Sequence, residues 1–177
     1  NKTNPGKNGT ITIKAKTLWS PSGDSGSKYT AAHGIAVGNF SQRFNKKVSE
    51  DLVKTTINAD VVIEELRGGS IKTTGISSMD CSDLAINGRF TIKPGAISLM
   101  QWNRGDQSKT YGIYMIGSNN TISITSADID DSKNGSLSDL IKTDESLWGG
   151  KTEKNVLRIG GGTLKVKENQ KERYLIS

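Results

Sequence analysis

The chain has 177 residues, of which 33% are hydrophobic and 24% are charged, and its formal net charge is +6. A single cysteine and a single histidine exclude an internal disulfide bond, a zinc site built from several thiolates and any site that needs two imidazoles. No apolar run approaches the ~18 residues of a transmembrane helix, so we expect no insertion into a membrane.

The N-terminal part of the sequence shows one clear strand and one candidate helix. Residues 1–9 are polar and turn-rich, and we expect a flexible arm there, followed by a single β-rich domain over residues 10–177. Apolar and polar residues alternate over Thr10–Trp19 with the period of a half-buried strand. Ala31–Phe40 is typical of a short apolar strand. Asn45–Lys54 is the best candidate for a helix, of barely two turns.

Beyond residue 55 the sequence indicates strands joined by tight turns. The β-branched run Val61–Ile63 favours a strand over Ile57–Leu66. Asn87-Gly88 separates two apolar alternations, and Asn-Gly predicts a β-hairpin because both turn residues accept a positive φ. Pro94-Gly95 predicts another turn. Two further hairpin turns are expected, at residues 117–120 and 160–162.

The overall pattern predicts an all-β fold: a sandwich, or a β-solenoid-like or fibrous module. About nine candidate strands recur every ~10–15 residues, and no repeat of fixed length occurs, which argues against a regular solenoid. We therefore expect an antiparallel sandwich or a fibre-like β module with many hairpins and at most one or two short helices. Residues 128–151 are the least strand-like stretch and a candidate irregular insertion, with one helical turn expected over Ser138–Thr143.

One candidate for receptor contact lies between two predicted strands. Arg104-Gly105-Asp106 is expected at a hairpin tip, where it displays a cation and a carboxylate on either side of a flexible glycine. Integrin ligands use this arrangement, because the carboxylate completes the coordination of a metal ion held by the receptor. A polar loop that needs a glycine explains the same three residues.

Aromatic side chains near predicted strand ends are candidates for stacking on a flat ligand, such as a sugar ring. They are Trp102, Tyr111 and Trp148. Packing between subunits is the alternative use of these side chains.

Part of a calcium-loop template occurs near residue 130. Asp130, Ser132 and Asn134 stand at template positions 1, 3 and 5, but Ile141 replaces the bidentate glutamate that should close the site. An Asx-rich turn explains these residues as well. We therefore predict no metal and no cofactor, and keep this loop only as a weak calcium candidate.

The remaining reactive groups carry no catalytic spacing. His33 has no associated nucleophile motif and Cys81 has no neighbouring base, so both are expected to be structural. Carboxylates are numerous enough for a hydrolase, but the sequence does not give their separation. The 18 lysines are interleaved with acids and only six arginines occur, so nucleic-acid binding is not expected.

Two short stretches resemble known surface proteins. Gly34–Asn39 is similar to one copy of the apolar-glycine repeat in the heads of trimeric bacterial adhesins, and strands such as Thr10–Lys16 look like those of phage tail-fibre modules. We expect a non-enzymatic structural or attachment module of a surface appendage or particle: a phage or viral fibre or spike, or a bacterial adhesin. Such a module is extracellular, on a cell surface or on a virion.

The partners expected follow from the sparse apolar content. An isolated copy has little to bury, so self-association is expected, with a homotrimer as one arrangement, together with a protein or glycan receptor. The alternative is a carbohydrate- or anion-binding β-sandwich module.

Overall fold

The structure, a computed structural model, describes residues 9–16, 31–38, 52–68, 72–99, 109–132, 137–145 and 152–166. Every regular element in these ranges is a β-strand, which confirms the predicted all-β class. The strands are β1 (Gly9–Lys16), β2 (Ala31–Gly38), β3 (Val53–Ile57), β4 (Ala59–Gly68), β5 (Lys72–Met79), β6 (Ser82–Ile92), β7 (Ile97–Leu99), β8 (Lys109–Ile116), β9 (Thr121–Asp130), β10 (Asp139–Asp144), β11 (Val156–Ile159) and β12 (Gly162–Lys165).

All described strand pairs are parallel, so the predicted antiparallel sandwich with hairpins is wrong. Sheet A has eight strands in the order β1-β4-β6-β9-β11, with β3 and β7 also paired to β6 and β4, and with β12 paired to β9. Sheet B has the order β10-β8-β5-β2. Neighbouring strands come from successive passages of the chain, so the chain winds in coils that stack in sequence order.

The coils differ in length, which explains why the sequence shows no fixed repeat. Tyr111 pairs with Asp139, 28 positions later, whereas Lys72 pairs with Lys109, 37 positions later. The described strands stack in register, while the number of residues between successive strands differs from coil to coil. The absence of a fixed sequence period was therefore a poor argument against coiled winding.

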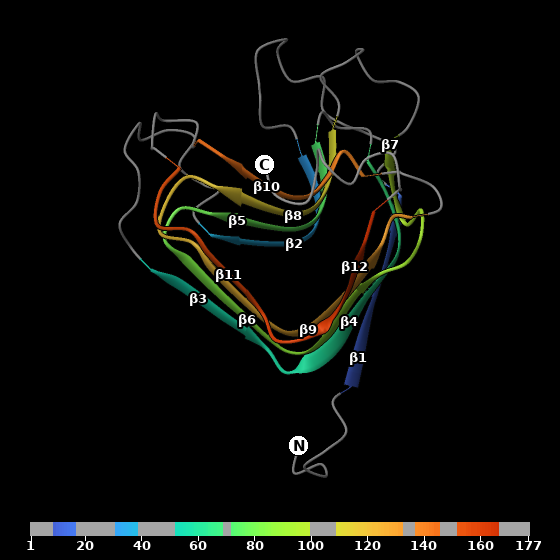
Figure 1. Cartoon of the computed structure of the whole chain (residues 1–177), viewed down its shortest axis with the longest axis horizontal. Coiled ribbons are helices and arrows are strands. Elements are labelled where there is room, and N and C mark those ends of the chain that lie inside the picture. The colour runs from blue at the N-terminus through green and yellow to red at the C-terminus, as the bar shows by residue number, and fades with distance from the viewer. Residues whose placement is uncertain are drawn as a thin grey trace.

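Each coil has three sides (Figure 1). Sheet A is bent into two arms, and sheet B closes the third side above them. The first arm contains β3, the beginnings of β6 and β9, and β11, while the second arm contains β1, β4, the ends of β6 and β9, and β12. No described segment forms a helix long and apolar enough to cross a membrane.

The predicted hairpin at Asn87-Gly88 is wrong, because β6 continues through these residues: it pairs with β3 before them and with β4 after them, and its register with β9 shifts between Ile86 and Arg89. The Asn87 amide donates to Oδ1 of Asn58, the residue between β3 and β4, over 2.8 Å. A Cβ at Gly88 would lie 2.2 Å from the carbonyl oxygen of Ala59. Glycine is thus needed here for close approach of two coils rather than for chain reversal.

The other expected turns give a mixed result. At residues 160–162 the expected hairpin is wrong, because β11 and β12 both pair in parallel with β9. The turn at Pro94-Gly95 is confirmed, with φ of +69° at Gly95 and a 3.0 Å hydrogen bond from Ala96 N–H to the Lys93 carbonyl. Residues 117–120 do turn the chain, but they lead from sheet B into sheet A rather than close a hairpin.

Strands occur in two places where the sequence predicted helical structure. Val53 and Lys54, the end of the predicted helix, begin β3, while residues 45–51 lie outside the described ranges. The helical turn expected over Ser138–Thr143 is wrong, because Asp139–Asp144 forms β10. Leu140 and Ile141 are buried there, and β10 pairs with β8. Burial and strand pairing override the weak local preference for a helix.

The apolar core fills the inside of the three-sided coil as rows of registered side chains. Val61, Phe90 and Ala127 form one row across β4, β6 and β9, and all three are fully buried. Ile86 and Ile124 form another such row in the first arm. Burial of each large side chain contributes about 1.5–3 kcal/mol to stability, so the core depends on repeated stacking of like residues.

Candidate functional site

The two central strands of sheet B, β5 and β8, are buried on both of their faces. All eight residues of β5 are buried, as are all residues of β8 after Lys109. Ile76, Ile113 and Met115 belong to the core inside the coil, whereas a second buried cluster of Met79, Tyr111, Tyr114 and Ile116 is separate from it. We call Lys72, Tyr111, Tyr114 and Asp144, which meet at this second cluster, the outer cluster of sheet B.

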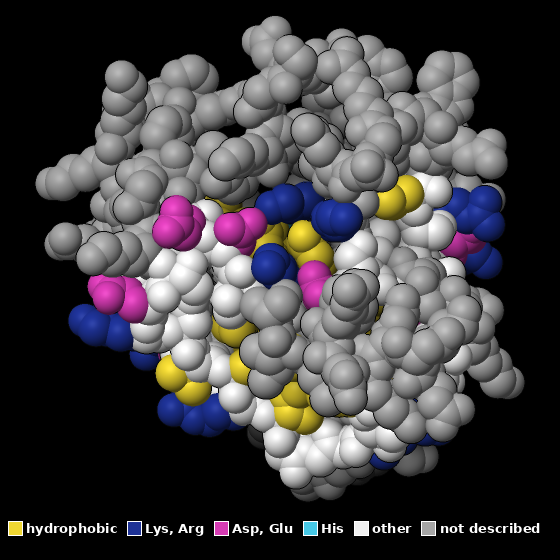
Figure 2. All heavy atoms as spheres, turned by 45° about the horizontal axis from the view of Figure 1, so that its top comes forward, with side chains coloured by type: hydrophobic (Ala, Val, Ile, Leu, Met, Phe, Trp, Pro, Cys, Tyr) yellow, Lys and Arg dark blue, Asp and Glu magenta, His cyan; other side chains and the backbone are white. Residues whose placement is uncertain are grey.

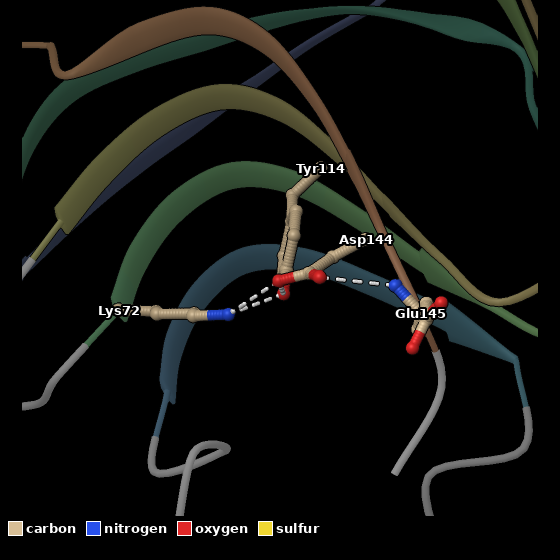
Figure 3. A network of polar contacts seen from close by, with 4 residues as sticks. All are labelled: Lys72, Tyr114, Asp144 and Glu145. Carbon is tan, nitrogen blue, oxygen red and sulfur yellow. Dashed lines mark hydrogen bonds and ion pairs between the residues drawn. The ribbon is translucent and has the colours of Figure 1, made fainter. Parts of the chain in front are cut away.

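Three polar groups of the outer cluster come from three successive coils (Figure 3). The Lys72 ammonium donates to Tyr114 Oη over 2.5 Å and to Asp144 Oδ2 over 3.1 Å. The Tyr114 hydroxyl donates to the same carboxylate oxygen over 3.2 Å. The ammonium also lies 4.7 Å from the centroid of the Tyr114 ring, which adds a cation–π contact.

The electrostatics of the cluster keep its charges fixed. The Lys72 side chain is 11% exposed and that of Asp144 is 43% exposed. Burial by itself would raise the pKa of Asp144. The hydrogen bond and the charge of Lys72, with smaller contributions from the Tyr114 hydroxyl and the Glu145 N–H, lower that pKa below its ordinary value. Asp144 is therefore a carboxylate at neutral pH and neutralises the Lys72 ammonium.

Tyr111, the one described member of the predicted stacking aromatics, lies beside Tyr114. Their ring centroids are 5.0 Å apart with a 34° tilt, and Tyr111 is 4% exposed. Burial, reinforced by the carboxylates of Asp139 and Asp144, raises the pKa of Tyr111 to about 12. Tyr111 is thus a neutral, buried side chain. Trp102 and Trp148 lie outside the described residues.

The face of the molecule above sheet B carries charged side chains of both signs around apolar ones (Figure 2). Lys109, in register with Lys72, is exposed there, and Lys142 of β10 is partly exposed in register with Tyr114. Cations, carboxylates and aromatic rings thus occur together on one side of the coil.

His33 of β2 joins the first coil to the second. Its Nδ1 lies 2.7 Å from Oγ1 of Thr74, its register partner in β5. Burial lowers the pKa of His33 to about 4, so the imidazole is neutral at pH 7. The geometry is that of a histidine held in a hydrogen bond between strands.

The corner between sheet B and the first arm repeats in three coils. Cys81, Asn119 and Lys154 occupy it with φ values of +53°, +57° and +56°. The residues that follow them, Ser82, Asn120 and Asn155, form a ladder. Ser82 Oγ donates to Asn120 Oδ1 over 2.8 Å, and Asn120 Nδ2 donates to Asn155 Oδ1 over 3.0 Å.

Neighbouring backbone and side-chain groups complete the corner. Asn120 Nδ2 donates to the Ile116 carbonyl and Asn155 Nδ2 donates to the Gly117 carbonyl. The Asp80 carboxylate accepts the Ser118 N–H of the next coil over 3.1 Å. Burial raises the pKa of Asp80, and the Ser118 hydrogen bond opposes that rise.

The calcium-loop residues are only partly described. Ser132 donates to Asp130 Oδ1 through both its N–H, over 3.0 Å, and its hydroxyl, over 2.5 Å, which is an Asx turn. The other oxygen, Asp130 Oδ2, lies 3.9 Å from Lys165 Nζ. Asn134 lies outside the described residues, as do Arg104, Gly105 and Asp106. In the described part of the chain no three metal-binding side chains form a group.

Sequence reasoning singled out Tyr111 of the outer cluster, but it missed the polar contacts of Lys72, Tyr114 and Asp144. Lys72 is 42 positions from Tyr114 and 72 positions from Asp144, so no local spacing connects them. The only available signal was the repeated strand pattern, which places Lys72 and Tyr114 together only once the coil register is known.

Comparisons of the chain with protein-family models, with curated proteins and with solved structures found no match in any of the three. The chemistry of these groups therefore follows from their own contacts. His33, Lys72, Asp80 and Asn120 each contact a group in a neighbouring coil. The common effect of these contacts is to hold successive coils together.

Proposed function

We propose that the chain is a non-enzymatic scaffold and attachment module of the parallel β-helix kind, part of a surface appendage or particle such as a phage or viral fibre, a spike or a bacterial adhesin. One observation carries this proposal: the described polar groups best suited to chemistry, His33, Lys72, Asp80 and Asp144, are bonded from coil to coil. Groups engaged in this way stiffen a scaffold and are poorly placed to attack a substrate.

The architecture supports the same proposal. Stacked apolar rows and inter-coil hydrogen bonds give a rigid body whose coils follow one another along an axis. Connections between strands vary in length without disturbing the stack, so they are available to present contact residues. In this proposal Arg104-Gly105-Asp106 is the receptor-contact loop, the receptor is a protein or a glycan, and copies associate side by side, with a homotrimer as one arrangement.

Two measurements on the whole chain test the proposal. Multi-angle light scattering is expected to give a defined oligomer. The immobilised chain is expected to retain cells or glycans. Its retention of integrin-bearing cells is expected to be lost in Asp106→Asn and kept in the matched variant Asp83→Asn. Incubation with a panel of polysaccharides is expected to release no new reducing ends. Release of reducing ends that disappears in Asp144→Asn would overturn the non-enzymatic assignment.

A second function, carbohydrate or anion binding, is favoured by one feature of sheet B. Ser77 is in register with Tyr114, and its buried hydroxyl has no hydrogen-bond partner among the described residues. A ligand hydroxyl or anion that reached this buried group would satisfy it. A glycan array separates the two functions: specific binding that Ser77→Ala weakens and Asp106→Asn leaves intact supports the second.

A further inference from the structure

A column of alternating charge crosses the second arm of sheet A. Four register pairs align an inward-facing apolar residue in five successive coils: Ile13 with Ile63, Ile63 with Ile92, Ile92 with Ile129, and Ile129 with Leu164. The residue that follows each of them in the sequence is charged, and its sign alternates along the column. The column is Lys14, Glu64, Lys93, Asp130 and Lys165.

The contacts follow this alternation. The Lys93 ammonium donates to Glu64 Oε1, and Lys165 Nζ lies 3.9 Å from Asp130 Oδ2. At Lys14 the register of β1 shifts by one residue, yet its charge still acts on Glu64. The hydrogen bond and charge of Lys93, together with the charge of Lys14, lower the pKa of Glu64. Each described carboxylate of the column therefore has a cation beside it.

Both ends of the column are positive, because the number of layers is odd. Neither β1 nor β12 contains an acidic residue, and the same is true of β3 and β11, the outer strands of the first arm. The basic residues of these four strands are Lys14, Lys16, Lys54, Arg158 and Lys165. The acidic residues of sheet A lie instead on its inner strands β4, β6 and β9.

We propose that each outer edge of the second arm is a docking site for a parallel β-strand of another protein that carries a carboxylate in this column, directly after an apolar residue. The chain shows the pattern such a strand needs, in Ile63-Glu64 and Ile129-Asp130. An apolar residue opposite Leu164, which is only partly buried, would extend the core by one layer.

The same column discriminates against a second copy of this chain. End-to-end stacking in register would place Leu164 against Ile13 and the Lys165 ammonium beside that of Lys14. Neighbouring strands lie about 4.8 Å apart, and like charges directly opposite each other at this spacing are destabilising. The exposed edges therefore carry lysine as protection against polymerisation, and charge complementarity selects the acidic strand.

The experiment creates a partner of the required sign from the chain itself. The double variant Lys14→Glu/Lys165→Glu has a carboxylate at both ends of the column, where the wild type has an ammonium at both. At low salt, sedimentation velocity is expected to show a heteromeric complex only in the mixture, with an apparent Kd about tenfold lower than for self-association of either chain. At 1 M salt, where the Debye length is about 3 Å, the preference is expected to vanish.

Two further controls complete the test. Lys109→Glu in the inner strand β8 makes a similar charge change away from the edges and is expected to give no complex with the wild type. Circular dichroism establishes that each variant is folded. If the double variant does not fold, each single variant has opposite charges at the two ends of the column and is expected to self-associate. Association of wild type end to end at low salt, or no preference in the mixture and in both single variants, overturns the proposal.

Discussion

The Lys72 ammonium lies 2.5 Å from the phenolic oxygen of Tyr114, a residue 42 positions further along the chain and one coil away. The Asp144 carboxylate, one coil further again, accepts hydrogen bonds from both. One buried cation thus links three successive strands of sheet B, and its removal is expected to loosen all of them.

Lys72→Met is expected to destabilise the fold by about 1–3 kcal/mol, because Asp144 and Tyr114 lose their common partner in a mostly buried position. Asp144→Asn is expected to cost less, since the Asp144 side chain is partly exposed. In urea denaturation, the loss of stability in the double variant Lys72→Met/Asp144→Asn should differ from the sum of the two single losses by about 0.5–2 kcal/mol. The exposed Lys109→Met is the control, with a change within about 0.5 kcal/mol. Full additivity of the two variants would contradict the linkage.

Asn120 is the central rung of the corner ladder, and Asn120→Ala is expected to lower stability by about 2–4 kcal/mol. The change removes the side-chain bonds to the Ile116 carbonyl, the Ser82 hydroxyl and the Asn155 amide oxygen, and of these partners Asn155 keeps its bond to the Asn120 backbone N–H. Asn119→Gly next to it should be nearly neutral, because glycine accepts the positive φ found there. Thermal unfolding compares the stability of the two variants. Equal losses of stability would contradict a stabilising role of the Asn120 side-chain bonds.

Stability is expected to decrease in mild acid because of His33. Its pKa is about 4 in the fold and 6.5 ordinarily, so the unfolded chain binds the additional proton between these values. Stability is then fully present above pH 6.5 and is lost as the pH falls toward 4, by up to about 3 kcal/mol. The lowered pKa of Asp144 acts in the same direction at lower pH, and the raised pKa of Asp80 acts in the opposite direction.

The comparison that isolates this effect is His33→Gln, which retains a hydrogen-bonding group for Thr74 and does not titrate. Urea denaturation of both chains at intervals from pH 7.5 to 4 should show a steeper loss of stability in the wild type. Parallel curves would assign the acid sensitivity to the carboxylates instead.

Glycines in sheet B let the coils approach closely. A Cβ at Gly34, Gly75 or Gly112 would lie 2.6–2.8 Å from a backbone carbonyl oxygen of the next coil. At Gly75 it would also meet Ile92 Cδ1 at 2.9 Å. Gly75→Ala is therefore expected to cost about 2–3 kcal/mol, whereas Gly161→Ala, with nothing within 4 Å of the added carbon, should change the melting temperature little. A harmless Gly75→Ala would refute this close contact.

Local sequence patterns identified strands well but not their partners. The alternation over Thr10–Trp19 predicted a strand, and its described part lies in β1, while residues 17–19 lie outside the described ranges. The β-branched run at Val61–Ile63 lies in β4. Alternation reports that one face is buried, and it is the same for parallel and antiparallel pairing. Asn87-Gly88 therefore suggested a hairpin, although the glycine there serves close approach to Ala59 of another coil.

The site was harder to predict than the strands. His33 was singled out as the single histidine, and Tyr111 as an aromatic residue near a predicted strand end; their partners Thr74 and Tyr114 were not predicted. The bond from Lys72 to Asp144 spans 72 positions, and coils of unequal length give no fixed offset from which to find it. Such contacts become visible only when the register of each strand with its neighbour in space is known.

The alternating column from Lys14 to Lys165 also constrains how such a chain can grow in evolution. Duplication of one coil would set two equal charges side by side, whereas duplication of two neighbouring coils would preserve the order of signs. Electrostatics thus favours the addition of coils two at a time. The charged surface residues of the column are the cause of this preference.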